Sequence, residues 1–253
     1  METGMLYPVC CVAGKLKKHY SMPNLPKRND RVCFIGPTGS GKTFLARRIL
    51  SKYDQVIILD GKHDNETWGS WKRNKAVNFA DSLTKLERHL NAMREPGHGR
   101  AVLYQPPREH LRASEVASLD EVFGMAYDRG KTLVYVDDLV LVARNSAAFA
   151  RTPNYQDCVT CGRAKGVGIW SSIQRPARIP LVAMTESEHQ FVFYLRNGDD
   201  RDTVDDVLGD DPPAPWNTLK AVKYSFVHGT NEGVYGPHVL GESGIKEAVT
   251  VPT

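Results

Sequence analysis

The sequence has 253 residues and a formal net charge of +4 at pH 7; 41% of its residues are hydrophobic and 25% are charged. This composition is ordinary for a soluble globular protein, and no apolar run approaches the roughly 20 residues of a membrane span, so no membrane association is expected. The five cysteines are an odd number, so we expect reduced thiols in a cytoplasmic protein rather than a disulfide framework.

Residues 1–30 are predicted to form a basic N-terminal extension. Basic side chains crowd the part of this segment before the first apolar strand: Lys15, Lys17, Lys18, His19, Lys27 and Arg28. Such an arm could contact phosphates or could be a solvated tail, and the sequence leaves both readings open. The main domain is expected over residues 31–240, followed by a flexible C-terminal tail at residues 241–253.

Residues 32–50 predict a buried strand, a glycine-rich turn and a helix in direct succession. The turn reads G-x-x-x-x-G-K-T, a complete P-loop motif in the required context, which disfavours a chance glycine turn. Its glycines let backbone N–H groups approach an anion, and the positive end of the helix points to the same place. Lys42 is expected to bind the β- and γ-phosphates of ATP, and Thr43 to bind Mg²⁺. The predicted phosphate-binding residues are Gly36, Pro37, Thr38, Gly39, Ser40, Gly41, Lys42 and Thr43.

Apolar runs and helical periodicity alternate along the rest of the chain. Strands are predicted at 55–60, 100–104, 132–138, 167–174 and 190–196, helices at 80–94, 114–129 and 200–208, and a terminal hairpin at 221–227 and 233–236; residues 154–166 are helical or loop-like. Strands that alternate with helices indicate a mostly parallel sheet flanked by helices on both faces. With the P-loop, this pattern predicts an α/β fold with a RecA-like (ASCE) P-loop ATPase core and a C-terminal β-hairpin.

Polar side chains end two of the predicted strands. Asp137 and Asp138 follow the apolar run at 133–136; in P-loop ATPases the first acid of such a pair holds Mg²⁺ and the second polarises the attacking water. Two adjacent buried carboxylates repel each other unless a cation lies near them, which also favours a metal over an exposed loop start. Gln174 ends the next strand, where it could contact the γ-phosphate or cap a turn.

A longer stretch is more specific than these motifs. Residues 161–176, CGRAKGVGIWSSIQRP, resemble the G-R to Q-R-P stretch of the FtsK/HerA family of DNA-translocating ATPases, which includes the genome-packaging ATPases of many viruses. Residues 58–62, ILDGK, resemble the family's strand ending in D-P-K, with Gly61 in place of proline, and residues 199–204, DDRDTV, resemble its D-S-R-T-I segment. The resemblance runs from about residue 31 to 208 with the motifs in the family's order.

The resemblance implies roles for individual residues. Lys42 and Thr43 match the P-loop lysine and threonine, Asp137 matches the Mg²⁺-binding acid, and Gln174 matches the sensor. Arg163 or Arg201 matches arginines at the subunit boundary, where one would act as an arginine finger on the neighbour's ATP; a surface ion pair is the alternative for each. The predicted catalytic residues are therefore Lys42, Asp137, Asp138, Gln174, Arg163 and Arg201, and the predicted metal ligands are Thr43 and Asp137.

Asp138 departs from the family pattern, which usually has glutamate at this position. Because aspartate is one methylene shorter, either the loop brings the carboxylate closer, or turnover is slow, or another acid serves. The chain is also small, without room for membrane helices or a winged-helix orienting domain, which points towards the compact viral packaging type.

The resemblance implies an ATP- and Mg²⁺-dependent DNA translocase, most simply a viral DNA-packaging ATPase that pumps a genome into a capsid. The expected partners are double-stranded DNA, further copies of the chain in a hexameric or pentameric homo-oligomeric ring, and a capsid portal vertex, with no membrane; the expected location is the host cytoplasm or the virion. One alternative is a Zot-like assembly factor that binds nucleotide with little hydrolysis, which Asp138 favours. Another is a small-molecule or nucleoside kinase, which the lack of an evident lid segment disfavours.

Overall fold

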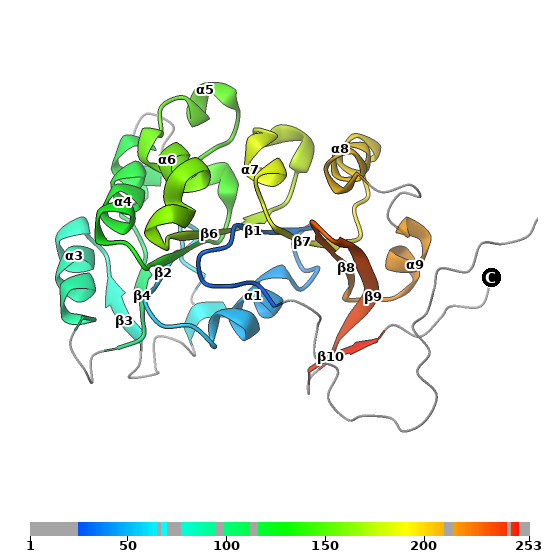
Figure 1. Cartoon of the computed structure of the whole chain (residues 1–253), viewed down its shortest axis with the longest axis horizontal. Coiled ribbons are helices and arrows are strands. Elements are labelled where there is room, and N and C mark those ends of the chain that lie inside the picture. Colours follow the sequence, from blue (N-terminus) through cyan, green and yellow to red (C-terminus); the bar gives the residue numbers. More distant parts are fainter. Residues whose placement is uncertain are drawn as a thin grey trace, which may run out of the picture.

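The computed structural model describes residues 25–64, 67–69, 77–94, 99–111, 116–209, 215–241 and 244–247 (Figure 1). The described strands are β1 (Val32–Ile35), β2 (Val56–Leu59), β3 (Val77–Ala80), β4 (Ala101–Tyr104), β5 (Leu133–Val136), β6 (Gly168–Ile173), β7 (His189–Phe193), β8 (Ser225–Thr230), β9 (Gly233–Gly241) and β10 (Gly244–Glu247). The described α-helices include α1 (Lys42–Leu50), α3 (Leu83–Ala92), α4 (Val116–Arg129), α5 (Ser146–Phe149), α6 (Pro153–Cys161), α7 (Val182–Thr185), α8 (Gly198–Leu208) and α9 (Trp216–Ala221).

These strands form one sheet in the order β10-β9-β8-β7-β1-β6-β5-β2-β4-β3. The strands from β7 to β3 in this order are parallel to their neighbours, whereas β8, β9 and β10 continue the sheet antiparallel at the β7 side. The α/β fold with a mostly parallel sheet and a C-terminal hairpin is therefore confirmed. Because β1, β6, β5 and β2 are neighbours, the loops that leave their carboxyl ends meet at one edge of the sheet, where such folds bind ligands.

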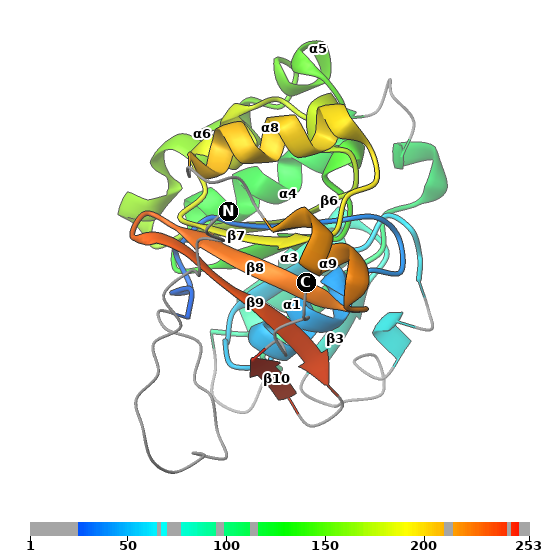
Figure 2. The same ribbon diagram turned by 90° about the vertical axis from the view of Figure 1, so that its right-hand side faces the viewer.

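Helices cover both faces of the sheet (Figure 2). Alternate residues of each strand point to opposite faces, so Cys33 and Ile35 of β1 join one apolar cluster, while Phe34 joins the other. The first cluster includes buried side chains of α3, α4, α6 and α8. The second is formed under α1, whose Leu45, Ala46, Ile49 and Leu50 pack on the sheet. This packing fixes where α1 begins and therefore where the P-loop lies.

The sheet extends further than the sequence predicts. β3 is a four-residue edge strand with a mixed burial pattern, and its Phe79 is 42% exposed, so neither a continuous apolar run nor strict alternation marks it. The predicted flexible tail from residue 241 is wrong at residues 244–247, which pair with β9 as β10; Ile245 packs against the second apolar cluster. The short helices α5, α7 and α9 were also not predicted.

Several predictions reach beyond the described residues. The basic residues at positions 15–19 and the predicted helix start at residue 114 lie outside them, and α4 is described from Val116. The segment predicted as helical or loop-like at 154–166 is α6 followed by a 3₁₀ turn at Gly162–Lys165. Within the described ranges, no helix has the length and apolarity needed to cross a bilayer.

Candidate nucleotide-binding site

The P-loop connects the carboxyl end of β1 to the start of α1. Gly39 and Gly41 have φ angles of 78° and 105°, a conformation that side-chain-bearing residues rarely adopt. Gly41 is the N-cap of α1, and no side chain caps the helix there, so its first N–H groups are left for another acceptor. A helix N-terminus of this kind, next to a glycine turn, favours a bound phosphate.

Lys42 folds back over the loop. Its Nζ donates to the Pro37 carbonyl oxygen at 2.8 Å, and the residue is only 6% exposed. Burial, reinforced by the nearby Lys62 ammonium, lowers the Lys42 pKa to about 8, against the opposing effect of Asp138 and Asp137. A buried ammonium of this kind would be stabilised by an anionic ligand.

Asp137 lies directly opposite Thr43. The Thr43 hydroxyl donates to Asp137 Oδ1 at 3.1 Å, the Trp68 indole N–H donates to Oδ2 at 3.2 Å, and the Tyr135 hydroxyl donates to Oδ1 at 3.1 Å. The carboxyl is 2% exposed, and this burial raises its pKa, although Lys62 opposes the effect. Trp68 and Tyr135 thus orient the acid towards the P-loop threonine.

Thr43 and Asp137 suit Mg²⁺, which takes hard oxygen ligands and is usually held by one or two carboxylates together with substrate phosphates and water. The two side-chain oxygens are 3.1 Å apart and both face the loop cavity. Mg²⁺ held by Thr43 and Asp137 would offset the negative charge that develops on the phosphates during hydrolysis. Its charge would also offset the burial that raises the Asp137 pKa.

Asp138 is held by two side chains at the same edge and accepts from the Val140 backbone N–H at 3.4 Å. Gln174 Nε2 donates to Asp138 Oδ2 at 2.7 Å, and Lys62 Nζ lies 3.2 Å from the same oxygen. Gln174 also accepts from the Thr38 hydroxyl at 2.9 Å, so this amide links the P-loop to the second acid. Gln174 directly follows β6, the strand that pairs with β1, and this places its side chain beside the P-loop.

Lys62 is a functional candidate to which sequence reasoning assigned no role. Asp60, which directly follows β2 and is fully buried, accepts from the Lys62 backbone N–H at 3.1 Å and from Gln105 Nε2 at 2.6 Å. This turn directs the Lys62 side chain to Asp138 and to the Asp137 carbonyl oxygen, at 3.1 Å. The position of Lys62 just after a parallel strand could have suggested this role, whereas nothing in the sequence indicates the contact of Trp68 with Asp137.

The two predicted boundary arginines lie apart from this cluster. Arg163 is in the turn before β6, at the amino edge of the sheet, where its guanidinium lies 3.4 Å from Glu188. Arg201 is in the first turn of α8, beyond the carboxyl end of β7 and on the nucleotide side. The adjacent Asp200 pairs with Arg175 at 2.6 Å, so α8 is tied to the loop that follows Gln174.

A cavity of about 790 Å³ lies over the P-loop. Predicted site residues that line it include Lys42, Thr43, Asp137 and Gln174, joined by Lys62. Side chains and backbone of the C-terminal hairpin form another wall, through Tyr224, Leu240 and Gly241. The cavity thus combines the P-loop backbone, three cationic side chains, side-chain oxygens of the kind that Mg²⁺ prefers, and an apolar wall.

Comparison of the sequence with known proteins finds similarity to a DNA packaging ATPase. No protein-family model matches this chain. The chain is 27% identical over 207 residues to the DNA packaging ATPase P9 of Enterobacteria phage PRD1, a match that covers 79% of this chain and 81% of that protein.

Solved structures share the fold. The genome packaging NTPase B204 from Sulfolobus turreted icosahedral virus 2, in complex with AMPPCP, has a TM-score of 0.61 at 17% identity, over 83% of this chain and 99% of that chain. VirB4 of Thermoanaerobacter pseudethanolicus has a TM-score of 0.58 at 9% identity, over 87% and 89% of the two chains. The resemblance found in the sequence is confirmed: the chain has the fold of these P-loop ATPases and is similar in sequence to a viral DNA packaging ATPase.

Proposed function

We propose that this chain is an ATP hydrolase that translocates double-stranded DNA, and that it packages a viral genome. The observation that carries the proposal is the cluster at the carboxyl edge of the sheet, where Thr43 meets Asp137 and Gln174 joins Thr38 to Asp138. The similarity to a DNA packaging ATPase supports the choice of DNA as the substrate that is moved.

In this proposal each residue of the cluster has a distinct task. The P-loop N–H groups and Lys42 bind the phosphates, and Thr43 with Asp137 holds Mg²⁺. Asp138 accepts a proton from the attacking water, and Gln174 keeps that carboxylate aligned with the P-loop. The direct test is ATP hydrolysis by the purified chain with and without duplex DNA: we expect stimulation by DNA, and a rate that ignores DNA at low salt would contradict translocation.

Nucleotide binding is expected to take up protons near pH 8. The Lys42 pKa is lowered to about 8 without ligand, and phosphate charges would raise it, so roughly half of the Lys42 side chains gain a proton on binding at pH 8 and almost none do at pH 6.5. Titration calorimetry in buffers of different ionisation enthalpy measures this uptake. The Lys42→Met variant should lose the part of the uptake at pH 8 that Lys42 contributes, and a parent that takes up no more protons at pH 8 than this variant would refute the prediction.

We also propose that the chain works as a homo-oligomeric ring in which an arginine reaches the neighbour's ATP. Arg201 suits this task better than Arg163, because it lies on the nucleotide side of the sheet, whereas Arg163 is at the amino edge beside Glu188. A capsid portal vertex remains the proposed docking partner of such a ring. Mixed rings of Arg201→Ala and Lys42→Ala subunits would regain activity only if the arginine acts in trans.

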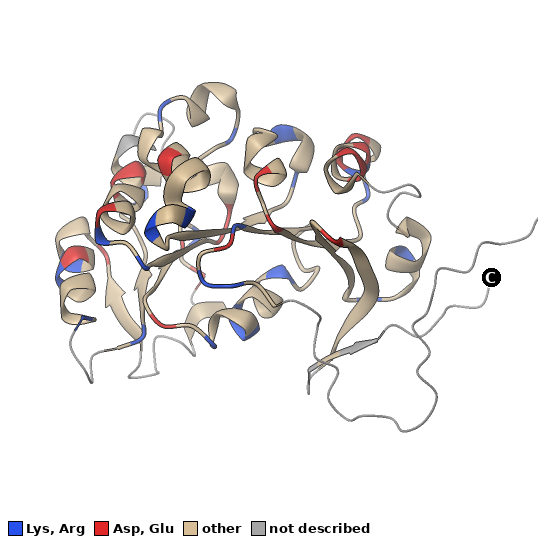
Figure 3. Cartoon of the chain, in the orientation of Figure 1, with Lys and Arg blue, Asp and Glu red and all other residues tan. Residues whose placement is uncertain are grey.

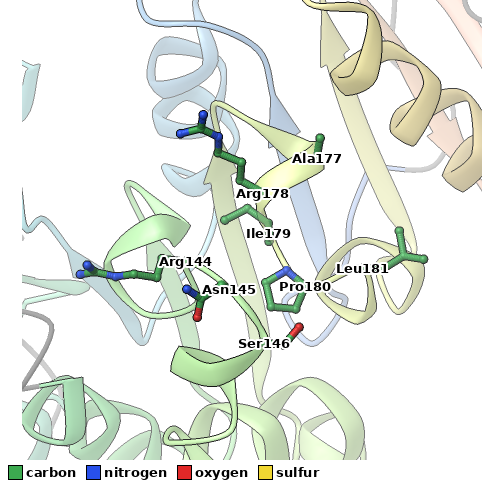
Figure 4. Close-up of a pocket in the computed structure, with 8 residues that line it drawn as sticks. All are labelled: Arg144, Asn145, Ser146, Ala177, Arg178, Ile179, Pro180 and Leu181. Atoms are coloured by element: carbon green, nitrogen blue, oxygen red, sulfur yellow. The ribbon is translucent and has the colours of Figure 1, made fainter.

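DNA contact is proposed at a groove of about 440 Å³ beyond the carboxyl ends of β5 and β6 (Figure 4). Arg144, after β5, and Arg178, after β6, both line this groove, together with Asn145, Ser146 and Pro180. Cations that follow a phosphate backbone serve a motor that must move along any sequence. The neighbouring helix α8 is rich in acidic residues and would not face DNA (Figure 3).

The double variant Arg144→Ala/Arg178→Ala is expected to weaken duplex binding and to reduce the slope of log K against log salt by about 2, since each lost phosphate contact accounts for about 0.9. Fluorescence anisotropy over a salt series measures the slope. The matched control Lys52→Ala/Arg88→Ala also removes two charges, from exposed positions outside the groove, and should leave the slope unchanged. Equal slopes for both double variants would exclude this groove as the DNA contact.

A second candidate function is an assembly factor that binds nucleotide as a switch with little hydrolysis. Asp138 favours it, because its carboxylate is shorter than the glutamate of the family and is already held by Gln174 and Lys62. Tight ATP binding with turnover near zero, and no affinity for DNA at low salt, would select this function over translocation.

A further inference from the structure

The cavity over the P-loop has two unlike walls. The wall near Asp137 is polar and includes Arg47, Lys62 and Asp64. The opposite wall comes from the C-terminal hairpin, which lies next to α1 in both ribbon views (Figures 1 and 2), and consists of Tyr224, Leu240 and Gly241. None of these hairpin residues carries a charge, so the two walls should receive different parts of a ligand.

The polar wall marks the end for the metal and the terminal phosphate. Thr43 contacts Asp137 at 3.1 Å, Trp68 contacts the same acid at 3.2 Å, and the Arg47 guanidinium lies 5.8 Å from the Trp68 ring. These contacts place Arg47 and Trp68 together beside the Mg²⁺ ligands. A nucleotide whose γ-phosphate lies at this end therefore has its nucleoside at the other end, towards the hairpin.

The hairpin wall is in direct contact with the P-loop. A methyl group added at Gly41 would come within 2.8 Å of Leu240 Cδ1 and 3.6 Å of a Tyr224 ring carbon. The Leu240 N–H donates to the Tyr224 carbonyl oxygen at 3.2 Å, which fixes the two residues to each other. Tyr224 and Leu240 are thus held immediately beside the first turn of α1, close to where the phosphates are proposed to bind.

Two exposed aromatic rings line the cavity, and one of them, Tyr224, belongs to the hairpin wall. Tyr224 is 41% exposed and Phe44, in the first turn of α1, is 49% exposed, and both belong to the small set of large apolar side chains exposed in the described residues. Tyr224 has φ 62°, which is unusual for a bulky residue, and strained residues of this kind concentrate at ligand sites. Lys223 Nζ lies 4.8 Å from the centre of the Tyr224 ring.

We propose that Tyr224, with Phe44 and Leu240, forms the nucleobase subsite of the nucleotide site, and that the base is bound by stacking and apolar contact. This proposal rests on the proposed nucleotide-binding function and adds a specificity to it. Every base has a flat π-face, so a stacking wall holds purines well but does not read the base edge. The site should therefore prefer purine over pyrimidine triphosphates and should discriminate little between ATP and GTP.

The test separates binding of the base from binding of the phosphates. Titration calorimetry measures the affinities of ATP, GTP, CTP and inorganic tripolyphosphate for the parent chain and for Tyr224→Gly, which removes the ring and also suits the positive φ angle. We expect ATP and GTP to weaken by about tenfold or more, since stacking on an aromatic ring contributes about 5- to 150-fold. Tripolyphosphate should bind both proteins equally, and Tyr224→Phe should bind ATP like the parent.

The outcomes distinguish failure of the nucleobase subsite from failure of the nucleotide-binding function. If the parent binds ATP no better than tripolyphosphate, or if Tyr224→Gly binds ATP as the parent does, the nucleobase subsite is wrong although the ATPase function stands. If the parent binds neither ATP nor tripolyphosphate, the nucleotide-binding function itself fails. If Tyr224→Gly and Tyr224→Phe both lose tripolyphosphate, the hairpin supports the P-loop and does not bind a base, which overturns the subsite.

Discussion

Lys42→Ala is expected to lower kcat/KM for ATP hydrolysis by at least about 10²–10³-fold, the usual effect of removing one preorganised donor from a site where negative charge develops. The Lys42 ammonium is 6% exposed and is held over the loop by the Pro37 carbonyl oxygen, so it is positioned before any ligand arrives. A steady-state assay of phosphate release measures the loss. Lys52→Ala, an exposed lysine just beyond α1, should hydrolyse ATP like the parent.

The same substitution should not destabilise the fold. Burial lowers the Lys42 pKa from its usual 10.5 to about 8, so folding disfavours the charged form. Burial of the charged Lys42 side chain therefore lowers the free energy of unfolding. This destabilisation is complete below pH 8 and disappears as the pH rises towards 10.5. At pH 7, Lys42→Ala should therefore unfold at the parent's temperature or above it. Full hydrolysis by the variant would exclude Lys42 from the site, and a lower unfolding temperature would show that its loss of activity has a structural origin.

Much of the parallel core could be predicted because its strands are buried on both faces. Residues 56–59 and 133–136 are unbroken apolar runs, and every residue in them is buried. The edges could not be predicted in this way. Among the described strands β3 pairs with β4 alone and has a partly exposed surface, and β10 is specified by its pairing with β9 and by Ile245 against the sheet. Such contacts depend on residues distant in sequence, which local patterns do not record.

The candidate site shows the same difference between residues that local patterns predict and contacts that depend on distant residues. The P-loop, Asp137 and Gln174 could be located because each lies at the carboxyl end of a predicted parallel strand, and the carboxyl ends of neighbouring strands meet. The contacts around Asp137 and Asp138 could not, because they depend on how Trp68 and Lys62 fold back from the segment after β2. The resemblance to a family identified Arg163 and Arg201 as candidates but did not give their positions in the fold. The direction of the parallel strands distinguishes them, because Arg201 lies beyond the carboxyl end of β7 and Arg163 lies at the amino edge of the sheet.

Asp138→Asn is expected to lower kcat for ATP hydrolysis by about 10²–10⁴-fold while nucleotide affinity stays within a few-fold of the parent's, because the substitution removes a general base but preserves the side chain's size. The Asp138 carboxylate faces Gln174 at 2.7 Å and Lys62 at 3.2 Å, and it is not among the predicted Mg²⁺ ligands. Single-turnover hydrolysis and ATP titration measure the two quantities separately. Unchanged kcat would show that another acid activates the water.

Asp138→Glu and Lys62→Met then test why an aspartate can serve here. If Lys62 and Gln174 hold the short carboxylate at the position that a glutamate would otherwise reach, Asp138→Glu should retain hydrolysis, and Lys62→Met should lower kcat in the parent. In the Asp138→Asn background, Lys62→Met should lower kcat no further, since residues that act as a unit are not additive. An equal additional loss in both backgrounds would mean that Lys62 acts on the phosphates independently of Asp138, and the alignment of the acid would then depend on Gln174.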